Sequence, residues 1–200
     1  PATVSTMVVE TTAWQPKLSS VGNVRAFRGV ELSTEIGGLV QNVPIKSGMD
    51  VKEGDLLIKL NDASDVAQLN SLKALADLAK VINERDRQQL EIQAISKNVF
   101  DTSAADAKSK KAQVEQQTAL VAKKNLKAPF SGRVGIVAIN PGQYVNSGDK
   151  LLTLQTLDPI FVDFNLPQSN AEQIQVGQEV EVTTDAFKDV SFTGKITAVS

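Results

Sequence analysis

Residues 38–60 (GLVQNVPIKSGMDVKEGDLLIKL) and 132–154 (GRVGIVAINPGQYVNSGDKLLTL) decide the fold, because they are two copies of one pattern. The copies align without a gap at a constant shift of 94 residues. In both, short β-branched runs alternate with glycine-containing turns, which is typical of strands joined by tight connections. Identical residues pair Gly38 with Gly132, Val40 with Val134, Val43 with Val137, Gly48 with Gly142, Val51 with Val145, Gly54 with Gly148, Asp55 with Asp149, Leu57 with Leu151 and Leu60 with Leu154.

The repeated glycines predict two turns in each copy. Gly48 and Gly142 are expected at one turn with positive φ, and Gly54 and Gly148 at a second, because glycine adopts that conformation without a Cβ clash. A unit of this size cannot bury a sheet face alone. The two copies are therefore expected to pack together as one sandwich or flattened barrel.

The segment between the copies has a different character. Residues 63–125 contain no Gly or Pro and are rich in good helix formers. Residues 97–103 interrupt the pattern, with Asp101, Thr102 or Ser103 as expected caps of a second helix. We therefore expect an antiparallel helical hairpin whose tip stands far from its base. The expected coiled-coil seam consists of Leu75, Leu78, Ile82, Arg85, Gln89, Ile92 and Ser96 at 3–4 spacing, with Ala107, Val114 and Val121 at seven-residue steps.

Composition excludes several classes of function. The net charge of −2 gives no basic footprint for nucleic acid. The chain has no His and no Cys, which removes the commonest general base, the usual zinc ligands and thiolate nucleophiles. No apolar run reaches the length needed to cross a bilayer. We expect no catalytic residues, no bound metal and no cofactor.

The flanking segments predict further strands. Residues 160–166, 179–183 and 191–198 alternate in the manner of antiparallel strands, and residues 5–10 and 17–26 are also strand-like. The chain begins with Pro1 and ends at Ser200 directly after a strand-like run. From this we expect that an export signal or anchor precedes Pro1 and that the second β domain is incomplete at residue 200.

Four stretches carry a family resemblance: EIGGLV at 35–40, AISK at 94–97, APFSGRVG at 128–135 and LDPIFVDF at 157–164. In this order they resemble the periplasmic adaptors, or membrane fusion proteins, of tripartite efflux pumps. The resemblance is strongest to adaptors that serve resistance-nodulation-division (RND) transporters, and it covers nearly the whole chain.

The resemblance implies a mainly β fold with a long α-helical coiled-coil hairpin. It implies that the hairpin is inserted between the halves of a split lipoyl-like β-sandwich, beside an antiparallel β-barrel domain. The implied domains are the start of a membrane-proximal domain (1–12), the truncated β-barrel (13–31 and 155–200), the lipoyl-like domain (32–62 and 126–154) and the hairpin (63–125).

The implied function is mechanical. The family's adaptors link an inner-membrane transporter to an outer-membrane TolC-type channel, and they assemble as homo-oligomers, here expected to be hexamers, into a sealed conduit for drugs or toxic compounds. The implied location is the periplasm of a Gram-negative bacterium, with an anchor in the inner membrane. At the hairpin tip, the family's channel-docking pattern falls on Arg85, Leu90, Ser96 and Asp106, although Gln89 occupies the family's Leu position.

Two alternatives stay open. An adaptor of an ABC-type pump or of another secretion system would use the same modules. A lipoyl or biotinyl carrier uses the same duplicated half-barrel, but it needs a modifiable Lys on the turn between the halves. Here that junction, residues 60–63, runs into the helical segment, and Lys59 lies within the strand pattern. Carriage is therefore the weaker alternative.

Overall fold

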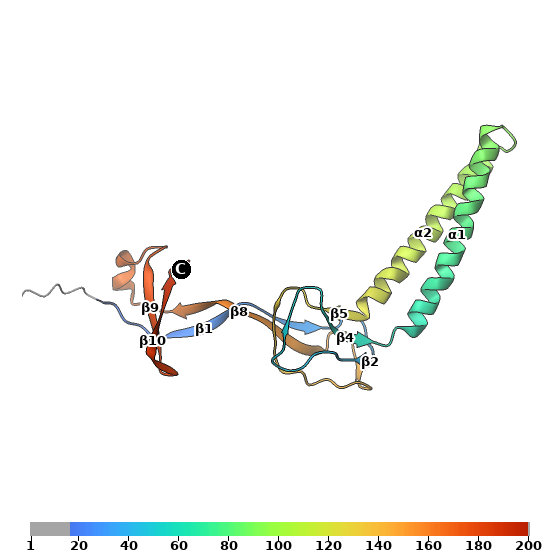
Figure 1. The fold of residues 1–200 in the computed structure, drawn as a ribbon. Helices are drawn as coiled ribbons and strands as arrows, with labels where there is room; N and C mark the ends of the chain where they lie inside the picture. The colour runs from blue at the N-terminus through green and yellow to red at the C-terminus, as the bar shows by residue number, and fades with distance from the viewer. Residues whose placement is uncertain (1–16, 200) are drawn as a thin grey trace, which may run out of the picture. The chain divides into compact units, whose positions relative to one another are not determined.

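The computed structural model describes residues 17–199, which fall into two compact units. The central unit is Ala26–Ile160, and the described part of the terminal unit combines residues 17–25 with residues 161–199. Two long strands, β1 (Gly22–Ser33) and β8 (Lys150–Phe164), contribute residues to both units (Figure 1). The expected strand at 5–10 and the expected membrane-proximal segment at 1–12 lie outside the described residues.

The central unit contains two four-stranded sheets whose paired strands are antiparallel. One sheet has the order β1-β8-β6-β3 and the other β5-β4-β2-β7. The fold is thus mainly β with antiparallel sheets and two helices, as the sequence predicted at this level. The shorter strands are β2 (Gly38–Asn42), β3 (Asp50–Val51), β4 (Leu56–Leu60), β5 (Asn125–Lys127), β6 (Gly132–Val134) and β7 (Tyr144–Val145).

The two sequence copies are interlocked, because strands of one copy pair with strands of the other. In the pair β2–β7, Leu39 lies opposite Tyr144. In the pair β3–β6, Asp50 lies opposite Arg133. The shift of 94 residues converts one pair into the other, so the duplication in sequence is a pseudo-twofold relation in structure.

The core contains the same positions of both copies. Val40 and Val134 are each 1% exposed, Leu57 and its equivalent Leu151 are 0% and 4% exposed, and Leu60 and its equivalent Leu154 are 2% and 0% exposed. Burying one such side chain contributes roughly 1.5–3 kcal/mol. Ile45 and Ile139, another identical pair under the shift, are buried in the same cluster. Neither copy could form this core alone, because its apolar face would be open to water.

All four repeated turn glycines have positive φ. The angles are 77° at Gly48, 86° at Gly54, 88° at Gly142 and 87° at Gly148. A Cβ at any of the four would meet nothing within 4 Å, so only the backbone conformation requires glycine there. The turns fix the directions in which β3, β4, β7 and β8 leave.

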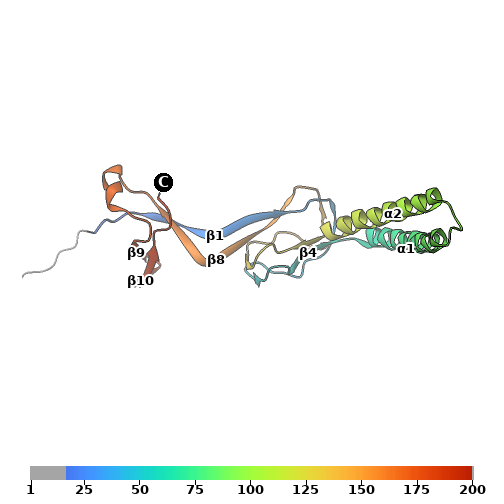
Figure 2. The same cartoon turned by 90° about the horizontal axis from the view of Figure 1, so that it is seen from above.

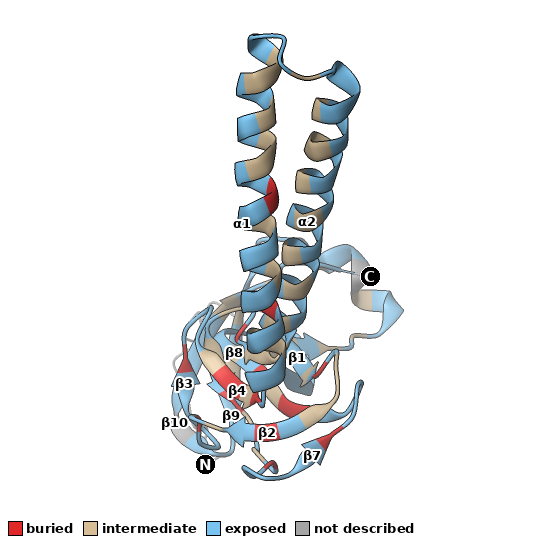
Figure 3. Ribbon diagram, turned by 90° about the vertical axis from the view of Figure 1, so that its right-hand side faces the viewer, coloured by how far each residue is buried: buried red, intermediate tan, exposed pale blue. Residues whose placement is uncertain are grey.

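Two long helices follow one another between β4 and β5. Helix α1 (Ala63–Glu91) has 29 residues and α2 (Lys97–Lys123) has 27. At about 1.5 Å per residue each is roughly 40 Å long. They lie side by side and are joined at one end, as two views show (Figures 2 and 3).

The seam between the helices differs from the expected one. Leu69 and Ala79 are buried and Ala76 is half-buried on α1, whereas Leu75 and Leu78 are exposed. The predicted α1 seam is therefore wrong at these leucines, because the side of α1 that faces α2 is the one that carries Leu69, Ala76 and Ala79. On α2, the predicted positions Ala107, Val114 and Val121 are half-buried.

The expected start of the second helix is also wrong. Helix α2 begins at Lys97 with Ser96 as its N-cap residue, five residues before the first expected cap. Thr102 and Ser103 lie inside the helix, where their hydroxyls donate to the carbonyls of Asn98 and Phe100. Such back-bonding satisfies the hydroxyls without ending the helix.

The terminal unit is a smaller β structure. Strands β9 (Glu179–Thr184) and β10 (Phe187–Lys195) form an antiparallel pair, preceded by a short 3-10 helix, η1 (Gln168–Gln173). Arg25 donates to Asp163 at 2.8 Å, and its guanidinium lies 5.2 Å from the centre of the Phe161 ring.

Candidate functional site

The connection between α1 and α2, residues 92–96, closes by backbone hydrogen bonds at the end of α1. The N–H groups of Gln93 and Ala94 donate to the carbonyls of Leu90 and Gln89 at 2.9 and 2.8 Å. Gln93 has a φ of 58°, the left-handed conformation in which helices commonly end. This closure produces a short, defined loop that places exposed side chains at the joined end of the helices, which we call the tip.

The four predicted tip residues differ in environment. Arg85 and Asp106 are exposed on α1 and α2, and Ser96 is exposed where α2 begins. Ser96 has an extended backbone (φ −78°, ψ 153°), and its side chain makes no capping hydrogen bond. Leu90 is only half-exposed and belongs to the side of α1 that faces α2. Three of the four are therefore accessible to a partner, and Leu90 is the least accessible.

Sequence reasoning placed Ile92 in the seam, but the structure gives it a different role. Ile92 is 76% exposed, directly after the last residue of α1, and Val99 is 47% exposed in the first turn of α2. An exposed isoleucine at the end of a helical pair is an apolar contact available to a partner. Ile92 follows Gln89 by three residues, and this spacing led the sequence analysis to place Ile92 in the seam between the two helices.

Arg85 differs from its neighbour Arg87 in having no acidic partner. Arg87 pairs with Glu84, three residues earlier, whereas no ion pair within residues 17–199 involves Arg85. The positions three and four residues from Arg85 on α1 carry no acidic residue. A guanidinium that is exposed and unpaired retains all its donors for a carbonyl or carboxylate of another molecule.

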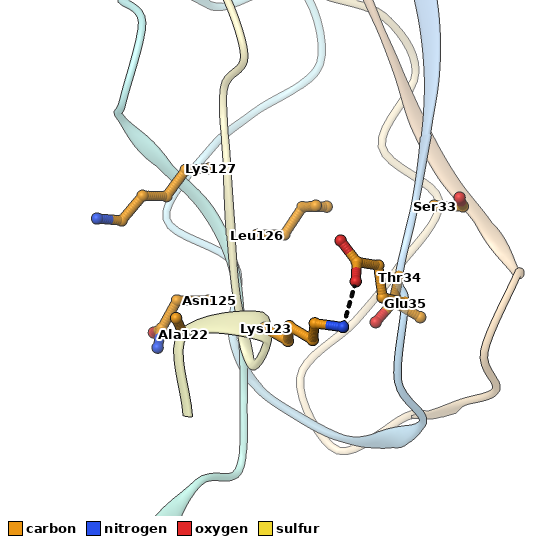
Figure 4. Close-up of a pocket in the computed structure, with 8 residues that line it drawn as sticks. All are labelled: Ser33, Thr34, Glu35, Ala122, Lys123, Asn125, Leu126 and Lys127. Atoms are coloured by element: carbon orange, nitrogen blue, oxygen red, sulfur yellow. Dashed lines mark ion pairs between the residues drawn. The ribbon is translucent and has the colours of Figure 1, made fainter. Parts of the chain in front are cut away.

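The base of the helices is fixed to the strands by lysine contacts. Lys123 Nζ lies 2.8 Å from Glu35 Oε2, and both residues line a pocket of about 310 Å³ (Figure 4). Lys124 donates to the carbonyl of Gly37 at 3.2 Å and lies 3.7 Å from Asp65. The last turn of α2, the first turn of α1 and the β1–β2 connection therefore hold one another. We interpret this pocket as a structural joint.

One strand edge of the central unit is electrostatically distinct. Arg133 donates two hydrogen bonds to Asp50, at 2.9 and 3.1 Å. This interaction lowers the pKa of the Asp50 carboxyl and raises that of Arg133. The pseudo-twofold equivalents of Arg133 and Asp50 are Leu39 and Tyr144, which are both exposed and carry no charge. The two edges of the duplicated unit therefore present different surfaces.

Three kinds of site are relevant to the described residues: a metal cluster, a membrane-spanning helix and a carrier lysine. Within residues 17–199, no cluster of His, Cys, Asp and Glu has the arrangement of a metal site. Neither α1 nor α2 has the length and hydropathy of a membrane-spanning segment. Lys59 lies in β4, 3.5 Å from Asp62, and the chain enters α1 directly afterwards. A carrier's exposed lysine turn is not formed there.

Comparison with known families gives two matches. A family model described as "RND MFP, barrel-sandwich hybrid domain" matches residues 28–157. A second model, "CusB-like, beta-barrel domain", matches residues 159–200. The first match alone covers more than half of the chain.

Relatives and solved structures agree with these matches. An uncharacterised protein of Haemophilus influenzae is 32% identical over 196 residues, covering 98% of this chain and 51% of its own length. The antibiotic efflux pump periplasmic linker protein ArpA of Pseudomonas putida is 33% identical over 164 residues, with 80% and 43% covered. The chain thus spans about half the length of the curated relatives it matches.

A solved structure supports the fold. A MacA-MexA chimeric protein containing the α-hairpin domain of Pseudomonas aeruginosa MexA superposes with a TM-score of 0.81 at 22% identity, covering 90% of this chain and 66% of that one. At this identity the likeness concerns the fold alone. The family model over residues 28–157 and the relatives above 30% identity confirm the resemblance read from the sequence, and the chain belongs to the RND-type membrane fusion protein family.

Proposed function

We propose that this chain is part of a periplasmic adaptor that links an inner-membrane RND efflux transporter to an outer-membrane TolC-type channel. Membrane fusion proteins of efflux pumps are structural adaptors and not enzymes. The observation that carries the proposal is the accessible tip, where Arg85 is exposed and unpaired and Ser96 and Ile92 are exposed at the joined end of two helices. A tip of this kind offers donors and apolar surface to another pair of helices.

We propose that each segment of the chain belongs to one of four domains. Residues 32–62 and 126–154 form a split lipoyl-like domain, with the hairpin of residues 63–125 inserted between its halves. Residues 13–31 and 155–200 belong to a β-barrel domain, and residues 1–12 begin a membrane-proximal domain. Strands of one half pair with strands of the other, which supports a lipoyl-like domain that acts as one rigid body. The ion pairs of Lys123 with Glu35 and of Lys124 with Asp65 support a hairpin that is held firmly on this domain.

The proposed polarity follows from these roles. The tip faces the channel, with Arg85, Ser96 and Asp106 as docking residues and Leu90 supporting them from the seam. The β domains face the transporter, and copies of the chain, six by family resemblance, enclose a conduit for drugs or toxic compounds. The adaptor works in the periplasm of a Gram-negative bacterium and is anchored in the inner membrane. The linker relative ArpA, whose name describes an antibiotic efflux pump, supports this location and cargo class.

The test compares two neighbouring arginines. Arg85→Asp reverses the unpaired charge, and Arg87→Asp reverses a charge on the same helix that has an internal partner. We expect Arg85→Asp to abolish efflux in drug-susceptibility assays while expression and helix content stay normal. We expect Arg87→Asp to retain efflux, since exposed helical ion pairs contribute only about 0.3–0.5 kcal/mol.

Either of two results would contradict the proposal. Full efflux by Arg85→Asp would remove the tip arginine from docking. Unfolding of Arg85→Asp, measured by circular dichroism, would show that the residue is structural.

The glycine turns Gly48, Gly54, Gly142 and Gly148 are proposed to be structural and not to contact a partner.

A further inference from the structure

The seam between α1 and α2 is regular in its spacing. On each helix its residues recur at steps of three and four and are buried or half-buried, and these sides face each other (Figure 3). Ser103 Oγ lies 3.4 Å from Asn83 Oδ1. Because the two helices are joined at the tip and run antiparallel, moving from this contact by equal numbers of residues toward the base gives the successive levels of the seam. These levels pair Ala79 with Ala107, Ala76 with Lys110, Leu72 with Val114 and Leu69 with Gln117.

Near the base, large aliphatic side chains fill the seam. Leu69 is 8% exposed, and Leu72 and Val114 are half-buried. Gln117, at the level of Leu69, donates to the carbonyl of Asp65 at 3.0 Å, one turn closer to the base, which agrees with the register. We call residues 65–72 and 114–121 the base zone. The lysine contacts described above hold this end of the hairpin on the strands.

The next three levels toward the tip have no large apolar side chain at a seam position. Half-buried Ile82 lies beside the seam position Asn83. Within residues 17–199 no ion pair involves half-buried Lys110, and a partly buried ammonium group without a carboxylate is unfavourable. An alanine buries much less apolar area than a leucine, so these levels hold the helices together less strongly than the base zone does. We call residues 76–83 and 103–110 the middle zone, whose seam positions are Ala76, Ala79, Asn83, Ser103, Ala107 and Lys110.

Beyond the middle zone, large apolar residues return. Leu90, Ile95 and Phe100 are half-buried near the joined end of the helices. The backbone hydrogen bonds from Gln93 and Ala94 also close the connection there. We call residues 84–102 the tip body. The weak levels therefore lie between two apolar ends, which differs from a seam that weakens steadily toward the tip.

We propose that the middle zone is a joint built into the hairpin, where α1 and α2 separate more readily than at the base and the tip body changes its direction. Local opening occurs where little apolar surface is buried. Helical segments as short as those of the middle zone are marginal in water on their own, so their amides lose protection when the helices separate. The inference rests on the proposed function, because the movement adjusts tip residues such as Arg85 to the helices of a partner.

Hydrogen exchange followed by mass spectrometry tests the joint in the intact protein without any partner. We expect the backbone amides of the middle zone to exchange at least about tenfold faster than those of the base zone. Equal protection in the two zones would overturn the proposal, because the alanine levels would then hold the helices as firmly as the leucine levels. Slower exchange in the middle zone would overturn it as well.

A variant with a stronger seam tests the cause. Asn83→Leu with Ser103→Ala, the braced variant, replaces both polar partners together, so neither is left without its neighbour, and it adds a leucine to the seam. We expect exchange in the middle zone to slow by about tenfold or more, as burial of one leucine side chain predicts, and exchange in the base zone to stay unchanged.

The matched control is Asn70→Leu with Ser109→Ala, which makes the same two substitutions at exposed positions. We expect it to leave exchange in the middle zone unchanged, and circular dichroism checks that both variants keep their helix content. Unchanged exchange in the braced variant, or equal slowing in the control, would overturn the proposal. If the braced variant does not fold, the comparison of zones in the unmodified protein still decides between a joint and a uniform seam.

Drug-susceptibility assays test whether the joint is used. We expect cells with the braced variant to be more susceptible than cells with the control, although both proteins are expressed equally. Equal susceptibility would show that docking does not need the movement, and it would overturn that part of the inference. Failure of the unmodified tip to capture any channel would refute the adaptor function alone, whereas hydrogen exchange decides on the joint without a channel.

Discussion

Replacing Gly132 by alanine should destabilise the central unit, whereas the same change at its pseudo-twofold equivalent, Gly38, should not. A Cβ at Gly132 would lie 2.5 Å from the carbonyl oxygen of Gln155 and 3.0 Å from its carbonyl carbon. These are backbone atoms of β8, which pairs with β6 through Arg133 and Gln155, so they cannot move without disturbing the sheet.

The environment of Gly38 is more tolerant. A Cβ there would meet Lys124 Nζ at 3.3 Å and Leu60 Cδ1 at 3.5 Å, so it would need only a shift of a few tenths of an ångström in a side chain and none in the backbone. Overpacking costs about 1–3 kcal/mol, and replacing glycine recovers about 0.4–1 kcal/mol by restricting the unfolded chain. We therefore expect Gly132→Ala to lose about 1–2 kcal/mol and Gly38→Ala to change by less than about 0.5 kcal/mol.

Urea unfolding followed by circular dichroism at 222 nm measures the difference, because both long helices belong to the central unit. The midpoint for Gly132→Ala should fall while the slope stays that of the unmodified chain. In thermal unfolding the loss corresponds to roughly 2–4 °C per kcal/mol for a chain of this size. Equal stability of the two variants, or a larger loss for Gly38→Ala, would refute the packing that distinguishes the two copies.

Two further predictions concern the same unit. Leu57→Ala, at a completely buried position, should cost about 2–5 kcal/mol in urea unfolding, and a smaller loss would mean that the cavity collapses. Asp50 should titrate below the ordinary carboxyl pKa in a nuclear magnetic resonance titration, because Arg133 donates to its charged form, and Arg133→Gln should return the pKa to the ordinary range. The stability contributed by the Asp50–Arg133 pair should be fully present above the pKa of Asp50 in the unfolded chain, and it should disappear as the pH falls through the lower pKa of Asp50 in the folded chain. An Asp50 pKa that is unchanged in Arg133→Gln would contradict Arg133 as the cause of the shift.

The strands and turns could be predicted because the same pattern occurs in two segments of the sequence, residues 38–60 and 132–154. A run such as Leu56–Leu60 is ambiguous alone, but its recurrence at a constant shift, with glycines at the same places, restricts it to a strand beside a tight turn. The helices could be predicted because residues 63–125 contain neither Gly nor Pro. Both signals are local, and local signals determine which element forms.

The packing of the helices could not be predicted, because a 3–4 period identifies a side of a helix without identifying what covers it. Leu75 and Leu78 have the period of a seam and face outward, whereas Ala76 and Ala79 form the seam since small side chains allow α2 to approach closely. Which side of α1 is buried depends on how α2 packs against it, and this packing is a property of the tertiary structure.

At the tip, too, some features could be predicted from the sequence and others could not. The alternation of acids and bases around Arg85 does not reveal that Arg87 pairs with Glu84 while Arg85 remains unpaired, although the absence of acids three and four residues away was a usable signal. The expected caps at Asp101–Ser103 failed because hydroxyls inside a helix can donate to earlier carbonyls. Ser96 was expected in the seam as well as among the docking residues, and the structure shows that it is exposed and is the N-cap residue of α2.

The adaptor function is tested most directly by capturing what the tip touches. Ser96→Cys is introduced into the intact protein in cells, where it is the only thiol of this 200-residue stretch, and is labelled with a thiol-directed photo-crosslinker. After irradiation, mass spectrometry identifies the captured protein. The account predicts an outer-membrane channel. Capture of only another copy, or of nothing by a folded and labelled protein, would contradict the proposed role of the tip.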